Sequence, residues 1–167
     1  MRKLTCLSCA AMALALGACG PTETKTEVAE TPAAPATPPP PAKAWISDMG
    51  GKDGRARLVY ALPGAAEYDL KFECKAKGPV YVTPGAKPPE GAKEYAFVLG
   101  TSGGDMPINS GVYNGVAEAA VPANSFGNIR YTGTLTLKES GKEPVNLDAK
   151  TPEQKAMIDQ FFKGCVG

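Results

Sequence analysis

The stretch YDLKFECKAK, from Tyr68 to Lys77, alternates apolar and polar residues without a break. Successive side chains of a β-strand point to opposite faces of the sheet, so this alternation predicts a half-buried strand. Its inward positions are Tyr68, Leu70, Phe72, Cys74 and Ala76. The opposite face, expected to be exposed to water, carries charged residues: Asp69, Lys71, Glu73, Lys75 and Lys77.

Other segments carry the same period of two and extend the prediction to a sheet. The clearest runs from Ile129 to Leu137, where apolar residues and glycine alternate with arginine and threonine. Weaker candidate strands are Arg55 to Leu62, Pro79 to Thr83, Glu94 to Leu99 and Val112 to Val121. Short strands separated by glycine and proline turns predict an antiparallel sandwich or a partly closed barrel.

The C-terminal segment changes to a helical period. Thr151, Pro152 and Gln154 form a helix-start signature, with a capping threonine and a proline at the first helical position. Five apolar residues then fall on one stripe of the helix: Met157, Ile158, Phe161, Phe162 and Cys165. The predicted fold class is therefore mainly β, with a C-terminal α-helix packed on the sheet.

The N-terminus has the composition of a secretion signal. Arg2 and Lys3 precede an apolar run from about Cys9 to Leu16, and small residues follow it. The run is too short for a membrane-spanning helix, which needs about 20 apolar residues. Export from the cytoplasm is therefore the expectation.

The end of this signal, Leu16-Gly17-Ala18-Cys19, resembles the lipobox of bacterial lipoproteins. The resemblance implies that residues 1–18 are removed and that Cys19 carries the acyl chains that bind the membrane. In lipoproteins of this kind an aspartate after the cysteine favours the inner membrane, whereas this chain has Gly20. The implied location is the outer membrane, facing the periplasm, with the inner membrane and the cell surface as alternatives.

Each of the five cysteines can then be assigned a role. Cys6 and Cys9 leave with the signal and Cys19 takes lipid, which leaves Cys74 and Cys165 to pair in an oxidising compartment. Such a disulfide closes a loop of about 90 residues and stabilises the fold by about 4 to 5 kcal/mol. The alternatives are two buried thiols or a metal site, but a chain without histidine lacks ligands for an ordinary zinc site.

Residues 19–43 read as the lipidated N-terminus and a proline- and alanine-rich linker, since almost no large apolar residue is present. An extended proline-rich spacer is expected there, with a docking site for a proline-recognising partner as the alternative. Residues 44–167 have the length of a single periplasmic domain. The whole chain has 18 basic and 17 acidic residues, a balance that argues against nucleic acid as a partner.

The sequence Gly100-Thr101-Ser102-Gly103-Gly104 matches the G-x-S-x-G elbow of many hydrolases. A serine nucleophile needs a base, usually histidine, and the chain has no histidine. The following Asp105-Met106-Pro107 also argues against a helix after the elbow. We therefore interpret this segment as a loop, without a catalytic role for Ser102.

Other constellations give weaker signals. Asp48 and Asp53 flank a glycine-rich turn but lack the alternating ligands of a calcium loop, so no metal site is expected. The lysines Lys71, Lys75 and Lys77, with Arg55 and Arg57, form a candidate basic patch whose alternative is a solvated face. The scattered carboxylates Glu94, Asp105 and Glu118 indicate no site, and Trp45 is expected to close the edge of the core.

A second resemblance concerns the domain itself. Phe72-Glu73-Cys74, Val80-Tyr81-Val82 and Ser110-Gly111-Val112-Tyr113 are similar to motifs of lipid-anchored periplasmic inhibitors of animal-type lysozyme. The resemblance implies a small β-barrel in which Ser110 and Tyr113 belong to a loop that enters the enzyme's cleft.

The leading prediction of function is a non-catalytic binding or envelope-support module without a cofactor. Its expected partners are the membrane, through the N-terminal lipid, and an envelope protein or peptidoglycan. The lysozyme-inhibitor role is one alternative, and a hydrolase with an unrecognised site is another.

Overall fold

Nine β-strands, two α-helices and one short 3₁₀ helix occupy residues 40–50, 53–75 and 77–166, the part of the chain that the computed structural model describes. The strands are β1 (Ala44–Asp48), β2 (Ala56–Ala61), β3 (Tyr68–Cys74), β4 (Val80–Pro84), β5 (Glu94–Thr101), β6 (Gly104–Tyr113), β7 (Val116–Val121), β8 (Thr136–Glu139) and β9 (Val145–Asn146). The helices are η1 (Ala123–Phe126), α1 (Gly127–Thr132) and α2 (Pro152–Val166). The predicted signal, Cys19 and most of the linker lie outside the described residues.

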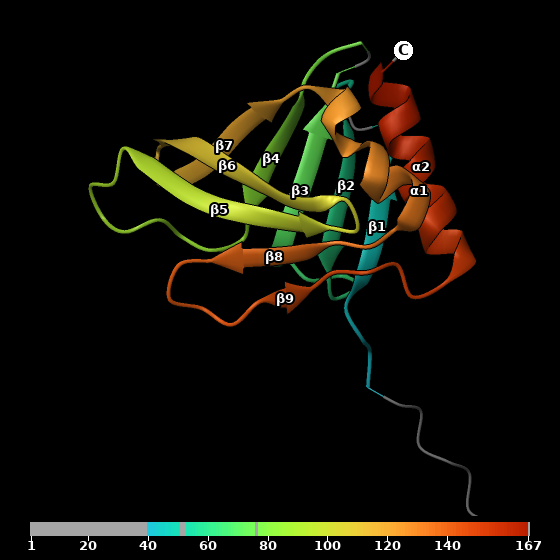
Figure 1. Cartoon of the computed structure of the whole chain (residues 1–167), viewed down its shortest axis with the longest axis horizontal. Helices are drawn as coiled ribbons and strands as arrows, with labels where there is room; N and C mark the ends of the chain where they lie inside the picture. The colour runs from blue at the N-terminus through green and yellow to red at the C-terminus, as the bar shows by residue number, and fades with distance from the viewer. Residues whose placement is uncertain (1–39, 51–52, 76, 167) are drawn as a thin grey trace, which may run out of the picture. The chain divides into compact units, whose positions relative to one another are not determined.

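The strands form one antiparallel sheet in the order β1-β2-β3-β4-β7-β6-β5-β8-β9. The sheet curls into a half-barrel, and the pairing of β4 with β7 joins its two halves (Figure 1). Trp45 on edge strand β1 donates its indole N–H to the carbonyl oxygen of Leu147, just beyond edge strand β9, at 2.6 Å. This bond links the two edges, and the buried indole confirms the role predicted for Trp45.

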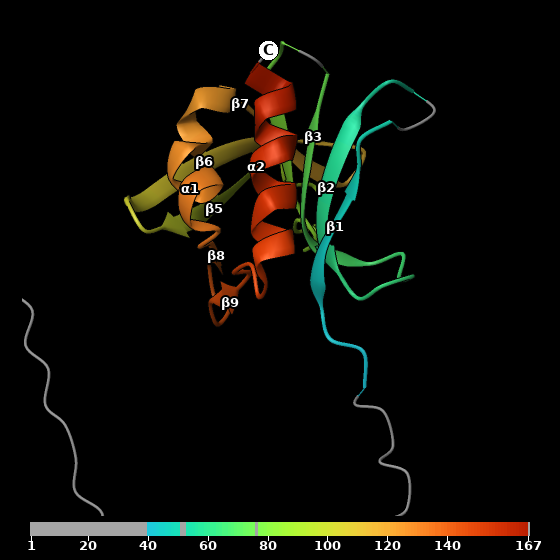
Figure 2. The same ribbon diagram turned by 90° about the vertical axis from the view of Figure 1, so that its right-hand side faces the viewer.

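The core lies between the curled sheet and the two α-helices, which pack side by side against it (Figure 2). Phe72 of β3 is fully buried at its centre, with ring centroids 5.3 to 6.4 Å from four other aromatic rings. Those rings belong to Trp45, Phe126, Phe161 and Phe162. The mainly β fold class with a C-terminal helix on the sheet is thus confirmed.

The half-buried strand predicted from the alternation is confirmed as β3, with two differences. The strand ends at Cys74 rather than Lys77, and Lys77 adopts a positive φ of 59° in the turn that follows. Glu73, expected to face water, is buried because Arg57 and Lys71 close over its carboxylate, at 2.7 and 2.8 Å.

The strand predicted from Ile129 to Leu137 is wrong over its first half. Ile129 lies in helix α1, which ends where Gly133 takes a left-handed φ of 70° and donates its N–H to the Ile129 carbonyl. Glycine adopts this conformation without a Cβ clash and so closes a helix C-terminus. Phe126 and Ile129, three residues apart, share the buried face, whereas Tyr131 points to solvent. Only Thr136 to Leu137 of the predicted strand belongs to β8.

The single strand predicted from Val112 to Val121 is also wrong, because the chain folds back within it. Asn114 and Gly115 have φ values of 51° and 75°, and Tyr113 pairs with Val116 across them. Two successive positive φ values in Asn-Gly are typical of the tight hairpin turn that suits twisted strands. Strands β6 and β7 therefore form a hairpin.

Helix α2 begins at Pro152, as predicted, and buries four of the five residues of the predicted stripe, whereas Met157 is only partly buried. The Thr151 hydroxyl accepts the Gln154 N–H at 3.3 Å, while the Gln154 side chain accepts the N–H of Lys150 at 2.9 Å. In the usual capping box the glutamine side chain accepts the N–H of the capping residue, here Thr151, whereas in this helix it accepts the N–H of the residue before it.

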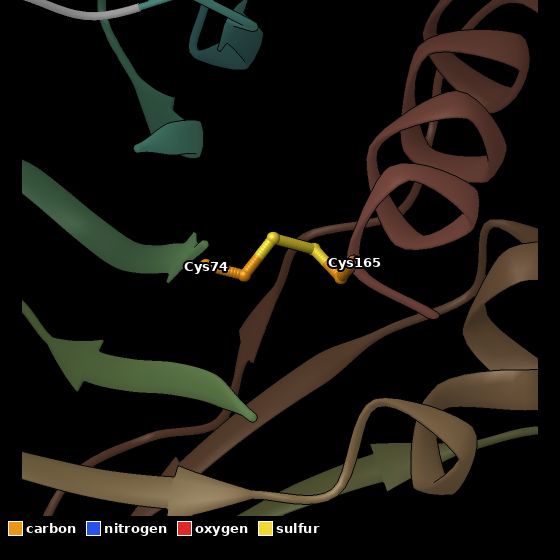
Figure 3. Close-up of a disulfide and its surroundings, with 2 residues drawn as sticks. All are labelled: Cys74 and Cys165. Atoms are coloured by element: carbon orange, nitrogen blue, oxygen red, sulfur yellow. A yellow bond between two sulfur atoms is a disulfide. The ribbon is translucent and has the colours of Figure 1, made fainter. Parts of the chain in front are cut away.

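Cys74 and Cys165 form a disulfide between the end of β3 and the last turn of α2 (Figure 3). Their Cα atoms lie 5.8 Å apart, and both side chains are buried. The predicted pairing is confirmed, and the bond fastens the C-terminal helix to the sheet.

Candidate functional site

A pocket of about 680 Å³ opens at one end of the half-barrel. Its walls come from the beginning of β3, the residues after β4, the β6–β7 hairpin and the strands β8 and β9. We call it the mouth and define it by Tyr68, Asp69, Gly85, Val116, Glu139 and Lys142. The volume lies in the range of small-molecule sites, and barrel mouths are among the places where such sites occur.

One wall of the mouth depends on a glycine. The Gly85 N–H donates to the Asp69 carbonyl at 2.8 Å, so the β3–β4 pairing continues past the end of β4. A Cβ atom on Gly85 would lie 1.6 Å from the carbonyl oxygen of Tyr68, a distance that no side chain tolerates. The residue at this position must therefore be glycine for the two backbones to approach.

A hydrogen-bonded group of three side chains joins the mouth to the core. Tyr95 on β5 donates its hydroxyl to Glu139 on β8 at 2.6 Å, and Lys142 contacts the other carboxylate oxygen at 3.1 Å. The Glu139 side chain is only 7% exposed. Burial, then the hydrogen bond to Glu139 and its negative charge, raises the pKa of Tyr95 to about 12. Tyr95 therefore remains a neutral donor at physiological pH.

Charged groups of both signs surround the opening. Asp69 is held by Lys43 at 2.8 Å, whereas Glu67 and Lys87 are exposed and form no ion pair within residues 40–50, 53–75 and 77–166. The mouth thus offers a carboxylate, an amine and the side-chain amide of Asn114 beside apolar walls. Such a set binds polar ligands that carry both donors and acceptors.

The two residues that the lysozyme-inhibitor resemblance implicates do not form a loop. Ser110 and Tyr113 both lie in strand β6 and, three residues apart, point to opposite faces. Ser110 is 2% exposed and donates its hydroxyl to the Tyr95 carbonyl at 2.6 Å. Tyr113 is 82% exposed beside the hairpin turn. Ser110 is therefore a buried structural residue, and Tyr113 alone is accessible to a partner.

The candidate basic patch is largely neutralised. Lys71 and Arg57 share the buried carboxylate of Glu73, and Arg57 also contacts Asp53 and Asp48. Burial alone would raise the pKa of Glu73, but the hydrogen bonds from Lys71 and Arg57 outweigh it and hold the pKa below its usual value. The pairing also occupies both aspartates that the calcium alternative requires.

Lys75 and Lys77 lie beyond the end of β3 and are exposed, so the three predicted lysines do not act as one group. Within the described residues, no cluster of three or more cysteine, aspartate or glutamate side chains has the geometry to hold a metal ion.

Ser102 lies in the tight turn between β5 and β6 and is exposed, as predicted for a loop. Its hydroxyl hydrogen-bonds to the hydroxyl of Thr132 at 3.5 Å. A threonine hydroxyl is no general base, so this contact does not activate the serine.

Comparisons with family models, with curated proteins and with solved structures give no match. Neither α-helix of the described part of the chain has the length and apolar character needed to cross a membrane.

Proposed function

We propose that this chain is a lipid-tethered periplasmic module that binds a polar envelope ligand in the mouth of its half-barrel without transforming it. The observation that carries the proposal is the mouth itself, a pocket of about 680 Å³ whose walls come from both halves of the sheet. Because these walls are joined by sheet pairing and by the Trp45–Leu147 bond, the pocket is preformed. A preformed pocket reduces the entropy lost on binding.

Fragments of peptidoglycan fit the chemistry of the mouth. Such fragments carry sugar hydroxyls, amides, carboxylates and amines on one molecule, and the mouth offers partners for each. The accessible Glu67 complements an amine, Lys87 complements a carboxylate, and Asn114 serves amides and hydroxyls. The ring of Tyr68 supplies an apolar face at the same opening.

Binding without catalysis is supported by how the deepest polar group of the mouth is used. The carboxylate of Glu139 already accepts a hydrogen bond from Tyr95 and pairs with Lys142. A carboxylate whose two oxygens both have protein partners is held in one position. We therefore assign Glu139 a structural role, in which it links strands β5 and β8 at the site.

The tether rests on the lipobox resemblance at Cys19, which brings the domain to the periplasmic face of the outer membrane. Mass spectrometry of the detergent-extracted protein tests it. The expected result is an acylated N-terminal peptide beginning at Cys19, and Cys19→Ser is expected to remove the acyl chains, so that high salt without detergent extracts the protein from the membrane. An unmodified N-terminus upstream of Cys19 would contradict the tether.

A matched pair of valines tests the mouth. Val116 lines it and is 47% exposed, whereas Val166, at the end of α2, is 46% exposed and lies outside its lining. Val116→Trp is expected to fill the opening and weaken binding of a soluble disaccharide-peptide, measured by calorimetry, by about tenfold or more, while Val166→Trp leaves it unchanged. Equal affinities for the two variants would contradict binding in the mouth.

A further inference from the structure

A second hollow, of about 530 Å³, lies between α1 and α2. We call it the helix groove and define it by Arg130, Tyr131, Lys155, Ala156, Asp159 and Lys163. The α2 residues among them recur at helical spacing and so form one stripe facing α1. The two helices pack against each other, which fixes the two walls of the groove (Figure 2).

The groove carries a surplus of positive charge. Arg130 and Lys163 both contact the carboxylate of Asp159, which neutralises one of the two. The hydrogen bond from Lys163, opposed by burial and aided by Arg130, holds the pKa of Asp159 below its usual value, so this carboxylate stays ionised. Lys155 forms no ion pair in the ranges that the structure covers. Three cations thus face one anion, on a chain whose total charge is only +1.

An exposed aromatic ring adjoins these charges. The Tyr131 side chain is 72% exposed, and the Arg130 guanidinium lies 5.9 Å from its ring centre. A single exposed ring is common on protein surfaces, but this one lies in the same hollow as the basic residues. Tyrosine is enriched at membrane–water interfaces, where its apolar body and polar tip are both accommodated.

We propose that the helix groove docks the domain onto a membrane surface that contains anionic lipid headgroups. Arg130, Lys155 and Lys163 meet the phosphates, and Tyr131 enters the interfacial layer. Each basic residue near an anionic surface contributes about 1 kcal/mol, so the groove alone gives weak and reversible attachment. A tethered domain meets its membrane at high effective concentration, which makes weak attachment sufficient. Only this last step rests on the proposed tether.

Docking through the helix groove leaves the mouth open. The groove is formed by α1 and α2 alone, whereas the mouth is formed by strands and their turns, and the two linings share no residue. The domain would then lie on the membrane by its helices and keep its ligand site in the periplasm.

Vesicle cosedimentation tests the docking. The protein is the mature chain from residue 19 with Cys19→Ser, so that no acyl chain contributes and the result does not depend on the tether. We expect it to bind phosphatidylglycerol-containing vesicles, to bind pure phosphatidylcholine vesicles much less, and to dissociate as salt is raised. Lys155→Glu is expected to weaken binding by about tenfold, and Tyr131→Ser severalfold.

Lys75→Glu is the matched control, because it makes the same charge change at an exposed lysine outside the groove. An equal loss with Lys75→Glu, or equal binding to neutral vesicles, would overturn the proposal. Release by glycerol phosphate at the concentration of the lipid phosphate would also overturn it, in favour of a soluble anion site. Circular dichroism checks that each variant is folded. If Lys155→Glu does not fold, Tyr131→Ser, at an exposed position, provides the test instead.

Discussion

Replacing Cys74 and Cys165 together by alanine is expected to lower the free energy of unfolding by about 4 to 5 kcal/mol. The two residues are 91 positions apart, so the disulfide restricts most of the domain in its unfolded state. It also fastens α2, whose residues Phe161 and Phe162 complete the aromatic core. The measurement is chemical denaturation of the oxidised protein and of the variant.

A reducing agent supplies the control for this prediction. It is expected to destabilise the natural domain by a similar amount and to leave the alanine pair unaffected, because the variant has no bond to lose. A loss below about 1 kcal/mol, far from the value for a loop of this length, would show that the disulfide does not contribute as the structure indicates. A small, marginally stable domain is expected to lose much of its folded population without the bond.

Phe72→Ala is expected to cost about 3 to 5 kcal/mol, the range for removing a fully buried phenylalanine. The ring is 0% exposed, and it contacts aromatic residues from β1, η1 and α2. Its removal leaves a cavity where the sheet meets both helical elements. Urea denaturation measures the loss as a lower midpoint at an unchanged slope.

The matched control for Phe72 is Tyr131→Ala, which removes an aromatic ring of similar size from the surface. Its expected effect is within about 0.5 kcal/mol, because exposed side chains away from special features contribute little. Equal costs for the two variants would contradict the position of Phe72 at the centre of the core.

The sequence predicts the parts of this fold that repeat a simple period. Alternation in Tyr68 to Cys74 identifies β3, and the stripe from Met157 to Cys165 identifies α2 and the face it buries. The disulfide follows, because each cysteine lies on the buried side of its own element. In these segments local pattern and tertiary packing agree.

Prediction fails where a short element contradicts its local period. Helix α1 has only six residues, too few for a helical period to stand out against the alternation of Ile129 to Leu137. Its packing against α2 and the left-handed Gly133 determine the conformation instead. The β6–β7 turn does have a sequence signal, because Asn114-Gly115 is a strong hairpin signature, but the prediction of one strand from Val112 to Val121 did not use it.

The mouth could not be predicted from the sequence. Its walls come from separate turns, and Tyr95 and Glu139, which support it, are 44 residues apart. The need for Gly85 arises from the backbone of Tyr68, which approaches it only in the folded sheet. Ser110 and Tyr113 precede the hairpin residues of the mouth by only a few positions, but they lie in β6 and their side chains point to opposite faces of the sheet.

Ligand binding in the mouth is tested most directly by titrating the isotope-labelled domain with a soluble disaccharide-peptide from peptidoglycan and following the titration by NMR. Binding in the mouth predicts chemical-shift changes that centre on Tyr68, Gly85 and the hairpin at residues 114–117, with the ligand recovered unchanged. Shifts elsewhere, no shifts at saturating ligand, or a cleaved ligand would contradict a binding module that uses its mouth.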